Sequence, residues 1–397
     1  MKILLLLICL FKISNFAYSE VKIGNLLALT GPIPTISELM GEAIDLAVEH
    51  INDQGALFEE NQKLVVIRKD SKCDPLEVIT SAKELVEIER VSGIIGPVCS
   101  IPTISQAEEV SIPSGVVTIT MSASSKKISS FELNSDLVFR TVSSYSHQGA
   151  ILAKVAMMKK IDNVVILYEN DKSNENLVNS FVKRYENLGG EVAHIISFEK
   201  GKDSYLNDTS ILRQKSENLI LISNDLESTI TVLNGLKKDN MFDIILGSEG
   251  LLSQKLIKEI DSELVKKLSV ISTAYDFDSL AFKEWEKYAN TAGIDATTPF
   301  LPNAYDATFI LGLAIEMAGS EDLEKIATSI RDIANSPGEK ILPGEWEKAK
   351  LLISSGESID YIGASGKIQF DDNGDVIGNY SINIIADTNW KSIIIDQ

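Results

Sequence analysis

The chain has 397 residues, with 37 basic against 57 acidic side chains and a formal net charge of −20. This charge argues against nucleic acid and anionic lipid as partners, because both are bound through basic patches. The hydrophobic fraction of 44% is that of an ordinary globular protein, not a disordered or membrane-embedded one, and the length favours two domains.

The N-terminus is typical of a cleavable secretory signal. Lys2 precedes an apolar run over residues 3–11, and small residues follow before Glu20. The run is too short to span a bilayer, so residues 1–19 are predicted to be a signal peptide that is cleaved near Ser19 and Glu20. Because this segment holds two lysines and no acid, its removal takes the net charge from −20 to −22. No later segment has the apolar length of a membrane span, so we expect a soluble mature chain in an oxidising compartment.

Strand and helix patterns alternate through the first third of the chain. They follow one another at residues 21–28 (strand), 38–51 (helix), 63–69 (strand), 75–88 (helix), 93–95 (strand), 104–110 (helix) and 116–119 (strand). Successive βα units of this kind predict a parallel sheet with helices on both faces.

A second series of the same kind follows. Its patterns lie at 147–158 (helix), 163–168 (strand), 174–188 (helix), 191–196 (strand), 204–215 (helix), 219–222 (strand), 228–237 (helix), 243–246 (strand), 253–260 (helix) and 268–272 (strand). The chain then turns helical at 280–292, 303–318, 322–334 and 345–353, and ends on strands at 367–370 and 380–385. The prediction is an α/β protein of two doubly wound parallel-sheet lobes with a cleft between them.

Polar residues follow four of the predicted strands, where open α/β sheets bind their ligands. The first lobe offers hydroxyls from Ser100, Ser122 and Ser124, and the second offers carboxylates from Asp225 and Glu249. Each residue alone is more often a helix cap or a solvated loop residue. Together they form a pattern: neutral donors suit a carboxylate, and an acidic side chain suits an ammonium. The pattern predicts an α-amino acid as ligand.

The cysteine count points to one disulfide. Cys9 leaves with the signal peptide, and Cys73 and Cys99 each follow a strand pattern. In an oxidising compartment we expect them to pair, with buried free thiols as the alternative. No cofactor or metal is expected: the three histidines lie far apart, and the acidic run 371–375 is better explained as a turn because Gln369 stands where a calcium loop needs its first carboxylate.

Several short motifs carry a family likeness. They are Leu29-Thr30-Gly31-Pro32, Cys73-Asp74-Pro75 with Cys99-Ser100, Phe139-Arg140-Thr141 with Gln148-Gly149, Gly247-Ser248-Glu249-Gly250, Tyr305-Asp306-Ala307, and Gly363-Ala364-Ser365-Gly366 followed by Phe370-Asp371 and Gly374-Asp375. Through them nearly the whole mature chain resembles the type I periplasmic binding proteins of ABC importers, the group that includes the branched-chain amino acid receptors. The resemblance implies two lobes joined by a three-strand hinge. Lobe 1 is expected at 20–142 with 273–370, and lobe 2 at 143–272 with 371–397.

The resemblance also implies roles for individual residues. Ser100 would hold the ligand carboxylate, Ser122 and Ser124 would supply a carbonyl and a hydroxyl, and Glu249 in the Gly-x-Glu-Gly loop would bind the amine. Ile36 would form an apolar wall.

The sequence departs from the branched-chain receptors at three positions. Tyr145 stands where they carry an aspartate, and Asp225 stands where they carry a tyrosine, so the amine is expected to lie between Asp225 and Glu249. Ser173 replaces a further aromatic contact, whereas Phe300 keeps an aromatic wall. These departures bear on the ligand's identity more than on its class.

The resulting expectation is a monomeric periplasmic receptor, not an enzyme. It would capture an amino acid, neutral and branched-chain-like, and deliver it to the permease and ATPase of an ABC importer. Lobe 1 would bind first, and closure near residues 142–143, 272–273 and 370–371 would bring up the acidic side chains. Three alternatives stay open: a ligand sensor for a chemoreceptor or kinase, an exported hydrolase that uses Ser100, and the same fold binding another small amide or carboxylic acid.

Overall fold

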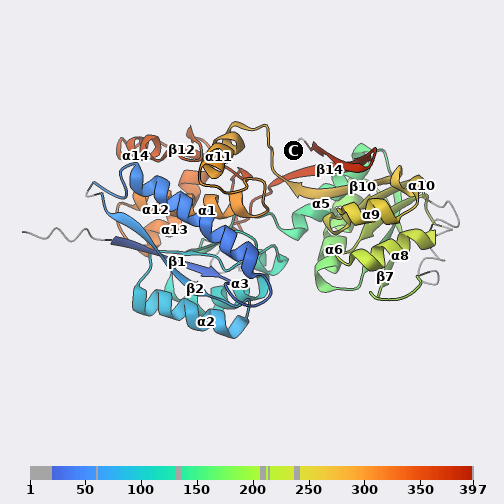
Figure 1. Cartoon of the computed structure of the whole chain (residues 1–397), viewed down its shortest axis with the longest axis horizontal. Coiled ribbons are helices and arrows are strands. Elements are labelled where there is room, and N and C mark those ends of the chain that lie inside the picture. The colour runs from blue at the N-terminus through green and yellow to red at the C-terminus, as the bar shows by residue number, and fades with distance from the viewer. Residues whose placement is uncertain are drawn as a thin grey trace, which may run out of the picture.

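The computed structural model describes residues 20–59, 61–130, 136–205, 212, 215–236 and 242–395. The predicted signal peptide and most of the helix predicted at 204–215 lie outside these residues. The chain forms two bodies side by side, joined by extended segments (Figure 1). Within the described ranges, no helix combines the length and the apolar character needed to cross a membrane.

The first body is built on a five-stranded parallel sheet of order β2-β1-β3-β4-β5. Its strands are β1 (Glu20–Leu27), β2 (Lys63–Asp70), β3 (Ile94–Ile95), β4 (Thr118–Thr120) and β5 (Val138–Arg140). The helices between them are α1 (Pro34–Asp53), α2 (Pro75–Lys83) with the π-helix η1 (Glu84–Glu89), α3 (Ser100–Gln106) with the π-helix η2 (Ala107–Ser111), α4 (Ile112–Ser114) and the 3₁₀ helix η3 (Lys126–Ser130).

Later helices complete the first body. They are α11 (Leu280–Thr291), α12 (Leu301–Ala318), α13 (Leu323–Ala334) and α14 (Trp346–Ser354). Helix α12 is apolar nearly all round, and it is accordingly buried from Leu301 to Ile315. A small sheet of order β11-β12-β13 lies beside them, made of β11 (Glu339–Ile341), β12 (Ile359–Gly363) and β13 (Gly366–Lys367).

The second body contains a seven-stranded sheet of order β15-β14-β10-β9-β8-β6-β7. The strands β6 (Asn163–Glu169), β7 (Glu191–Phe198), β8 (Asn218–Ile222), β9 (Ile244–Gly247) and β10 (Leu268–Ala274) are parallel, and β14 (Asn379–Ala386) and β15 (Asn389–Ile394) join them antiparallel.

Helices cover both faces of the second sheet. Helices α5 (Tyr145–Met158) and α6 (Lys172–Asn187) pack on one face. Helices α8 (Leu226–Leu236), α9 (Gln254–Glu259) and α10 (Ser262–Val265) pack on the other, next to the short 3₁₀ helix η6 (Glu249–Leu251). The predicted class is confirmed: an α/β chain with two doubly wound sheets and a hinge, with the second sheet extended by two antiparallel strands.

Three connections between the bodies run close together. Ser143, between β5 and α5, forms a bridge with Val376 and a hydroxyl hydrogen bond with Tyr380. In the β10–β14 pair, Thr273 lies opposite Tyr380. The predicted lobe boundaries stay predictions. Arg140 N–H donates a backbone hydrogen bond to the carbonyl of Gly374 (3.0 Å), which favours placing the third connection between the bodies a few residues beyond position 370.

Candidate functional site

The first-body part of the site lies at the ends of β3 and β4. Ser100 is the first residue of α3, half-buried, and its Oγ accepts a hydrogen bond from Ser125 N–H (3.3 Å). Ser122 donates its hydroxyl to the carbonyl of Val98 (2.7 Å). The predicted hydroxyls thus occupy neighbouring loops, tied together by hydrogen bonds.

The predicted disulfide lies beside this loop pair. Cys73 and Cys99 are bonded, with their Cα atoms 5.5 Å apart. Cys99 immediately precedes Ser100, so the bond connects the start of α3 to the residues before α2. The expectation of a disulfide is confirmed in the structure.

Tyr145 connects the two bodies. It is the first residue of α5, and its N–H donates to the carbonyl of Ser124 (3.2 Å). Burial raises the pKa of its hydroxyl and the nearby Glu249 carboxylate raises it further, whereas hydrogen bonds with the side chains of Ser124 and Ser173 act in the opposite direction. The Tyr145 hydroxyl therefore lies near Ser124 of the first body and near Ser173 and Glu249 of the second.

Glu249 opens the short helix that follows β9. Its Oε2 accepts hydrogen bonds from the hydroxyl (3.1 Å) and the N–H (3.3 Å) of Thr273, at the end of β10. Burial raises the pKa of this carboxyl. The two hydrogen bonds from Thr273 partly offset that effect, and the polar Gln148 carboxamide nearby acts in the same direction. Among the described residues, Glu249 forms no ion pair with a lysine or an arginine. The carboxylate is thus available to a cation brought by a ligand.

Gln148 adds a group that the sequence reasoning missed. Its side chain is buried, yet neither Nε2 nor Oε1 has a hydrogen-bond partner among the described residues. Because the carboxamide lies close to Glu249, two unsatisfied polar atoms adjoin the site. The Gln148-Gly149 pair was noted only as part of the family likeness. The helix start at Tyr145 was the signal that could have been used, because positions three apart share one helix face.

Asp225 is placed differently from the other predicted residues. Its Oδ1 accepts a hydrogen bond from Ser228 N–H (2.8 Å) at the start of α8, and hydrogen bonds from Ser228 lower its pKa. Its own N–H donates to Glu169 Oε2 (3.0 Å). The carboxylate acts as a helix cap in this structure, and Asp225 does not contribute to the pKa shift of Glu249. Its predicted role at the amine stays untested.

The two predicted walls lie in the first body. Ile36, in the first turn of α1, is half-buried against the core of that body. Phe300 precedes α12 with a φ of 70°, and its N–H donates to the hydroxyl of Tyr275 (2.9 Å) near the hinge. No described contact joins either side chain to Glu249.

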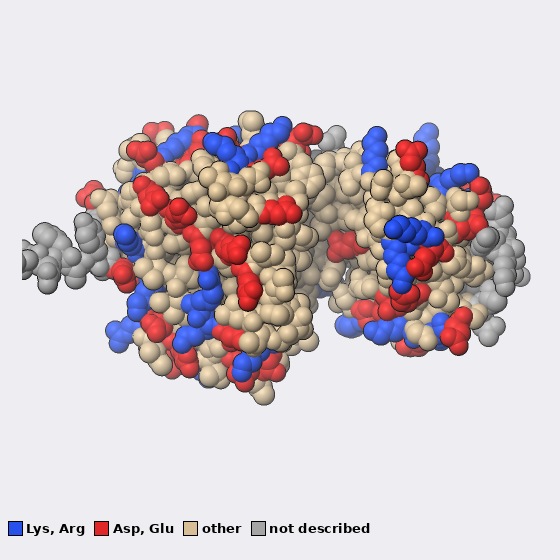
Figure 2. All heavy atoms as spheres, in the orientation of Figure 1, with Lys and Arg blue, Asp and Glu red and all other residues tan. Residues whose placement is uncertain are grey.

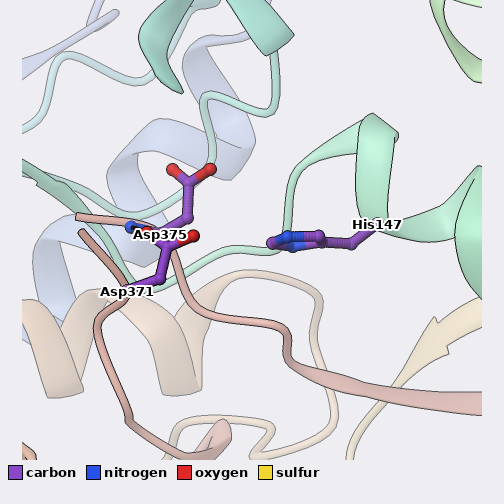
Figure 3. Close-up of side chains that lie close together, drawn as sticks. All are labelled: His147, Asp371 and Asp375. Atoms are coloured by element: carbon purple, nitrogen blue, oxygen red, sulfur yellow. Dashed lines mark hydrogen bonds between the residues drawn. The ribbon is translucent and has the colours of Figure 1, made fainter. Parts of the chain in front are cut away.

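Three side chains near the hinge have the composition of a metal site. The ligand atoms of His147, Asp371 and Asp375 lie within 4.8 Å of one another, with His147 facing the two aspartates from α5 (Figure 3). However, both oxygens of Asp375 already bind the buried Arg140 guanidinium, at 2.6 and 2.7 Å. A cation here would compete with Arg140, so the arrangement favours a structural ion pair.

The comparisons with known proteins agree with this architecture. The family profile "Receptor family ligand binding region" matches residues 39–387. The chain is 24% identical over 324 residues to a leucine-, isoleucine-, valine-, threonine- and alanine-binding protein of Pseudomonas aeruginosa, covering 80% of this chain and 83% of that protein. It is 24% identical over 361 residues to BasB of Halobacterium salinarum, a chemotactic signal transduction system substrate-binding protein, covering 89% and 84%.

A solved structure is similar over almost the full length. The leucine binding protein LivK of Thermotoga maritima has a TM-score of 0.66 and 23% identity, covering 95% of this chain and 99% of that one. This likeness confirms the predicted two-lobed fold of the type I periplasmic binding proteins. From the family match across most of its length, the chain belongs to the receptor family ligand binding region proteins.

Proposed function

We propose that this chain is the substrate-binding receptor of an ABC importer and that it captures a neutral amino acid between its two bodies. Its relative from Pseudomonas aeruginosa binds leucine, isoleucine, valine, threonine and alanine. The same ligand class suits a cleft with hydroxyls on one side and an acid on the other.

One observation carries the proposal. Glu249 lies next to Tyr145, and Tyr145 reaches Ser124 of the opposite body. A carboxylate that forms no ion pair among the described residues, the unsatisfied Gln148 carboxamide and a serine loop therefore lie near the same tyrosine. A buried ammonium needs a carboxylate partner, and neutral donors bind a ligand carboxylate without bringing a competing charge. A zwitterion meets both conditions.

Binding would drive closure of the two bodies. Figure 2 shows them separated by a gap below the region that connects them. Only a closed arrangement lets one small ligand touch both the serine loops and Glu249, so the ligand stabilises that arrangement. Moving the population from mostly open to mostly closed requires about 5.5 kcal/mol of differential binding. Hydrogen bonds to charged groups contribute about 1.5–3 kcal/mol each, so a few of them suffice.

A calorimetric screen tests the proposal. Neutral amino acids are titrated into the mature chain, and at least one, with leucine tried first, is expected to bind. Glu249→Gln should weaken that binding about tenfold or more, because an uncharged amide replaces the ammonium's partner. Glu259→Gln, an exposed acid of the same body, is the matched control and should bind normally. Equal affinity in all three proteins would refute the proposed amine site, and no binding of any amino acid would refute the ligand class.

A sensory role is the second candidate, favoured by the similarity to the chemotactic substrate-binding protein BasB. Uptake of the labelled ligand by cells with and without this chain separates the roles. Loss of uptake supports import, whereas normal uptake with lost chemotaxis supports sensing.

The remaining features of the proposal follow from the same role. The mature chain would reside in the periplasm after removal of residues 1–19 and act as a monomer. It would catalyse no reaction; formation of product from an amino-acid amide, lost in Ser100→Ala, would overturn that view.

A further inference from the structure

A cavity of about 390 Å³ lies at the hinge. Ile271 and Tyr380 pack with α5 and α6 on one face of the second sheet. Since side chains alternate along a strand, their neighbours Ser272 and Ser381 point to the opposite face, and both line the cavity. The cavity therefore extends over the face away from α5. Phe300 is the one predicted site residue in its lining, which also includes Thr273, the hydrogen-bond partner of Glu249.

Large apolar side chains from separate parts of the chain converge on this cavity. Leu252 follows η6, Phe277 lies between β10 and α11, and Ile394 ends β15. They are 39%, 51% and 39% exposed. Val142 and Phe300 extend the same wall. An apolar surface gathered from distant segments is typical of a ligand or partner site, and the volume falls in the range of small-molecule pockets.

The charge of the lining favours one class of ligand. Among the described residues of the lining, only Asp276 and Asp278 are charged. Asp278 is fully exposed and lies 3.7 Å from Lys283. Asp276 is half-buried and forms no ion pair among the residues that the structure describes; its Oδ1 accepts one hydrogen bond, from Asp278 N–H (3.2 Å). A carboxylate beside the aromatic rings of Phe277 and Phe300 suits an organic cation, because ring faces and carboxylates both attract positive charge.

We propose that this cavity is a second binding site, for a small apolar amine, and that its occupant opposes closure. Its walls come from all three connections, through Val142, Tyr275 and Asn379, and from both bodies. Closure of the two bodies must change the angle between these walls. An amine that fits the cavity in the open arrangement therefore stabilises that arrangement and opposes closure. The coupling rests on the proposed function, whereas the site itself does not.

Calorimetry with a charge series tests the site. Phenethylamine, 2-phenylethanol and phenylacetate share one apolar body, and the amine is expected to bind most tightly and the carboxylate least. Asp276→Asn should weaken amine binding three- to tenfold and leave the alcohol unchanged. Leu252→Lys, which places a cation in the exposed apolar wall, should abolish amine binding. Thermal melts of each variant confirm that it is folded.

Two variants distinguish amine binding in the cavity from amine binding in the cleft between the bodies. Glu249→Gln should leave phenethylamine binding intact. Loss of amine binding in Glu249→Gln but not in Asp276→Asn would overturn the proposal, because the amine would then occupy the cleft. Absence of saturable amine binding, or tighter binding of phenylacetate, would overturn it as well.

The coupling has its own readout. Saturating phenethylamine should weaken the binding of the amino acid found in the screen, and the amino acid should weaken amine binding by the same factor, since coupling between sites is reciprocal. Unchanged affinities would refute the coupling. Failure of every amino acid to bind would refute the proposed function, while the charge series would still decide the cavity.

Discussion

Glu249 holds a carboxylate in a setting that disfavours its charge. Burial raises its pKa, and the hydrogen bonds from Thr273 only partly offset this effect. An ammonium placed beside it would stabilise the charged form and lower that pKa. Under the proposed function, ligand binding would therefore be linked to the proton on this side chain.

Binding of the amino acid should release protons at mildly acidic pH. In the window between the ordinary carboxyl pKa and the raised one, free Glu249 is partly protonated and must lose its proton to meet the ammonium. Affinity should rise with pH through that window and level off above it. Calorimetry just above the ordinary carboxyl pKa, in buffers of different ionisation enthalpy, measures the release. Identical heats in all buffers would contradict the account, and Glu249→Gln should remove the effect.

Gln148 should matter for binding and not for folding. Its carboxamide is buried and unpartnered in the free structure, so Gln148→Leu removes two unmet polar atoms and should leave the free energy of unfolding unchanged or higher. The same change should weaken ligand binding about tenfold. Asn174→Leu is the matched control: its buried amide binds Asp171 Oδ2 (2.7 Å), and its loss should cost about 1–3 kcal/mol. Marked destabilisation by Gln148→Leu would show that the residue is structural.

How far single residues could be predicted depends on how many roles a residue type has. Ser124 and Glu249, which both follow predicted strands, lie near Tyr145, a position that only the family resemblance singled out. Asp225 follows a strand too, but an aspartate there serves equally as a helix cap, and only the structure shows its bond to Ser228. Gln148 went unassigned because burial without a partner is not visible in a sequence.

Among the elements, the link from β9 to η6 fixes the position of Glu249. A Cβ on Gly250 would lie 2.1 Å from the carbonyl oxygen of Ser223 at the end of β8. Only glycine allows this close approach, which explains the glycine after the acidic residue.

Gly250→Ala should push η6 away from β8 and move the Glu249 carboxylate. We expect a loss of about 1–3 kcal/mol in the free energy of unfolding, as for other overpacked sites, together with weaker ligand binding. Urea denaturation and calorimetry measure the two effects. Gly189→Asn is the control, because a Cβ there meets nothing within 4 Å and asparagine tolerates the positive φ. Equal stability of both variants would contradict the close-contact argument.

Long periodic elements and the short apolar strand β3 were predictable, whereas β11, β12 and β15 were not. Strands such as β6 and β8 are continuous apolar runs, as expected for buried parallel strands. Strand β15 exposes five of its six residues, so it has no apolar alternation to detect. Strand β11 has three residues, two of them exposed, and in β12 the buried Asp360 interrupts the apolar pattern.

Across the whole molecule, the buried Arg140–Asp375 pair ties the third connection to β5. Ser129 also donates to Asp375 (2.6 Å). A buried charge that loses its partner costs about 3–5 kcal/mol, whereas replacing both partners by apolar groups is often nearly neutral. The pair therefore holds the third connection against β5.

Asp375→Asn should lower the free energy of unfolding by about 3 kcal/mol, because it leaves the Arg140 guanidinium uncompensated. The double variant Arg140→Met/Asp375→Leu should recover much of this loss. Urea denaturation of the three proteins gives the comparison. A single variant as stable as the parent chain would contradict the role given to this pair.

The central claim is that one zwitterion bridges the serine loops of the first body and Glu249 of the second. A crystal structure of the mature chain with its tightest-binding amino acid tests it most directly. The account predicts closed bodies, the ligand carboxylate within hydrogen-bond distance of the loops that hold Ser100, Ser122 and Ser124, and the ammonium on Glu249. An ammonium bound elsewhere, or a ligand held by one body alone, would contradict it.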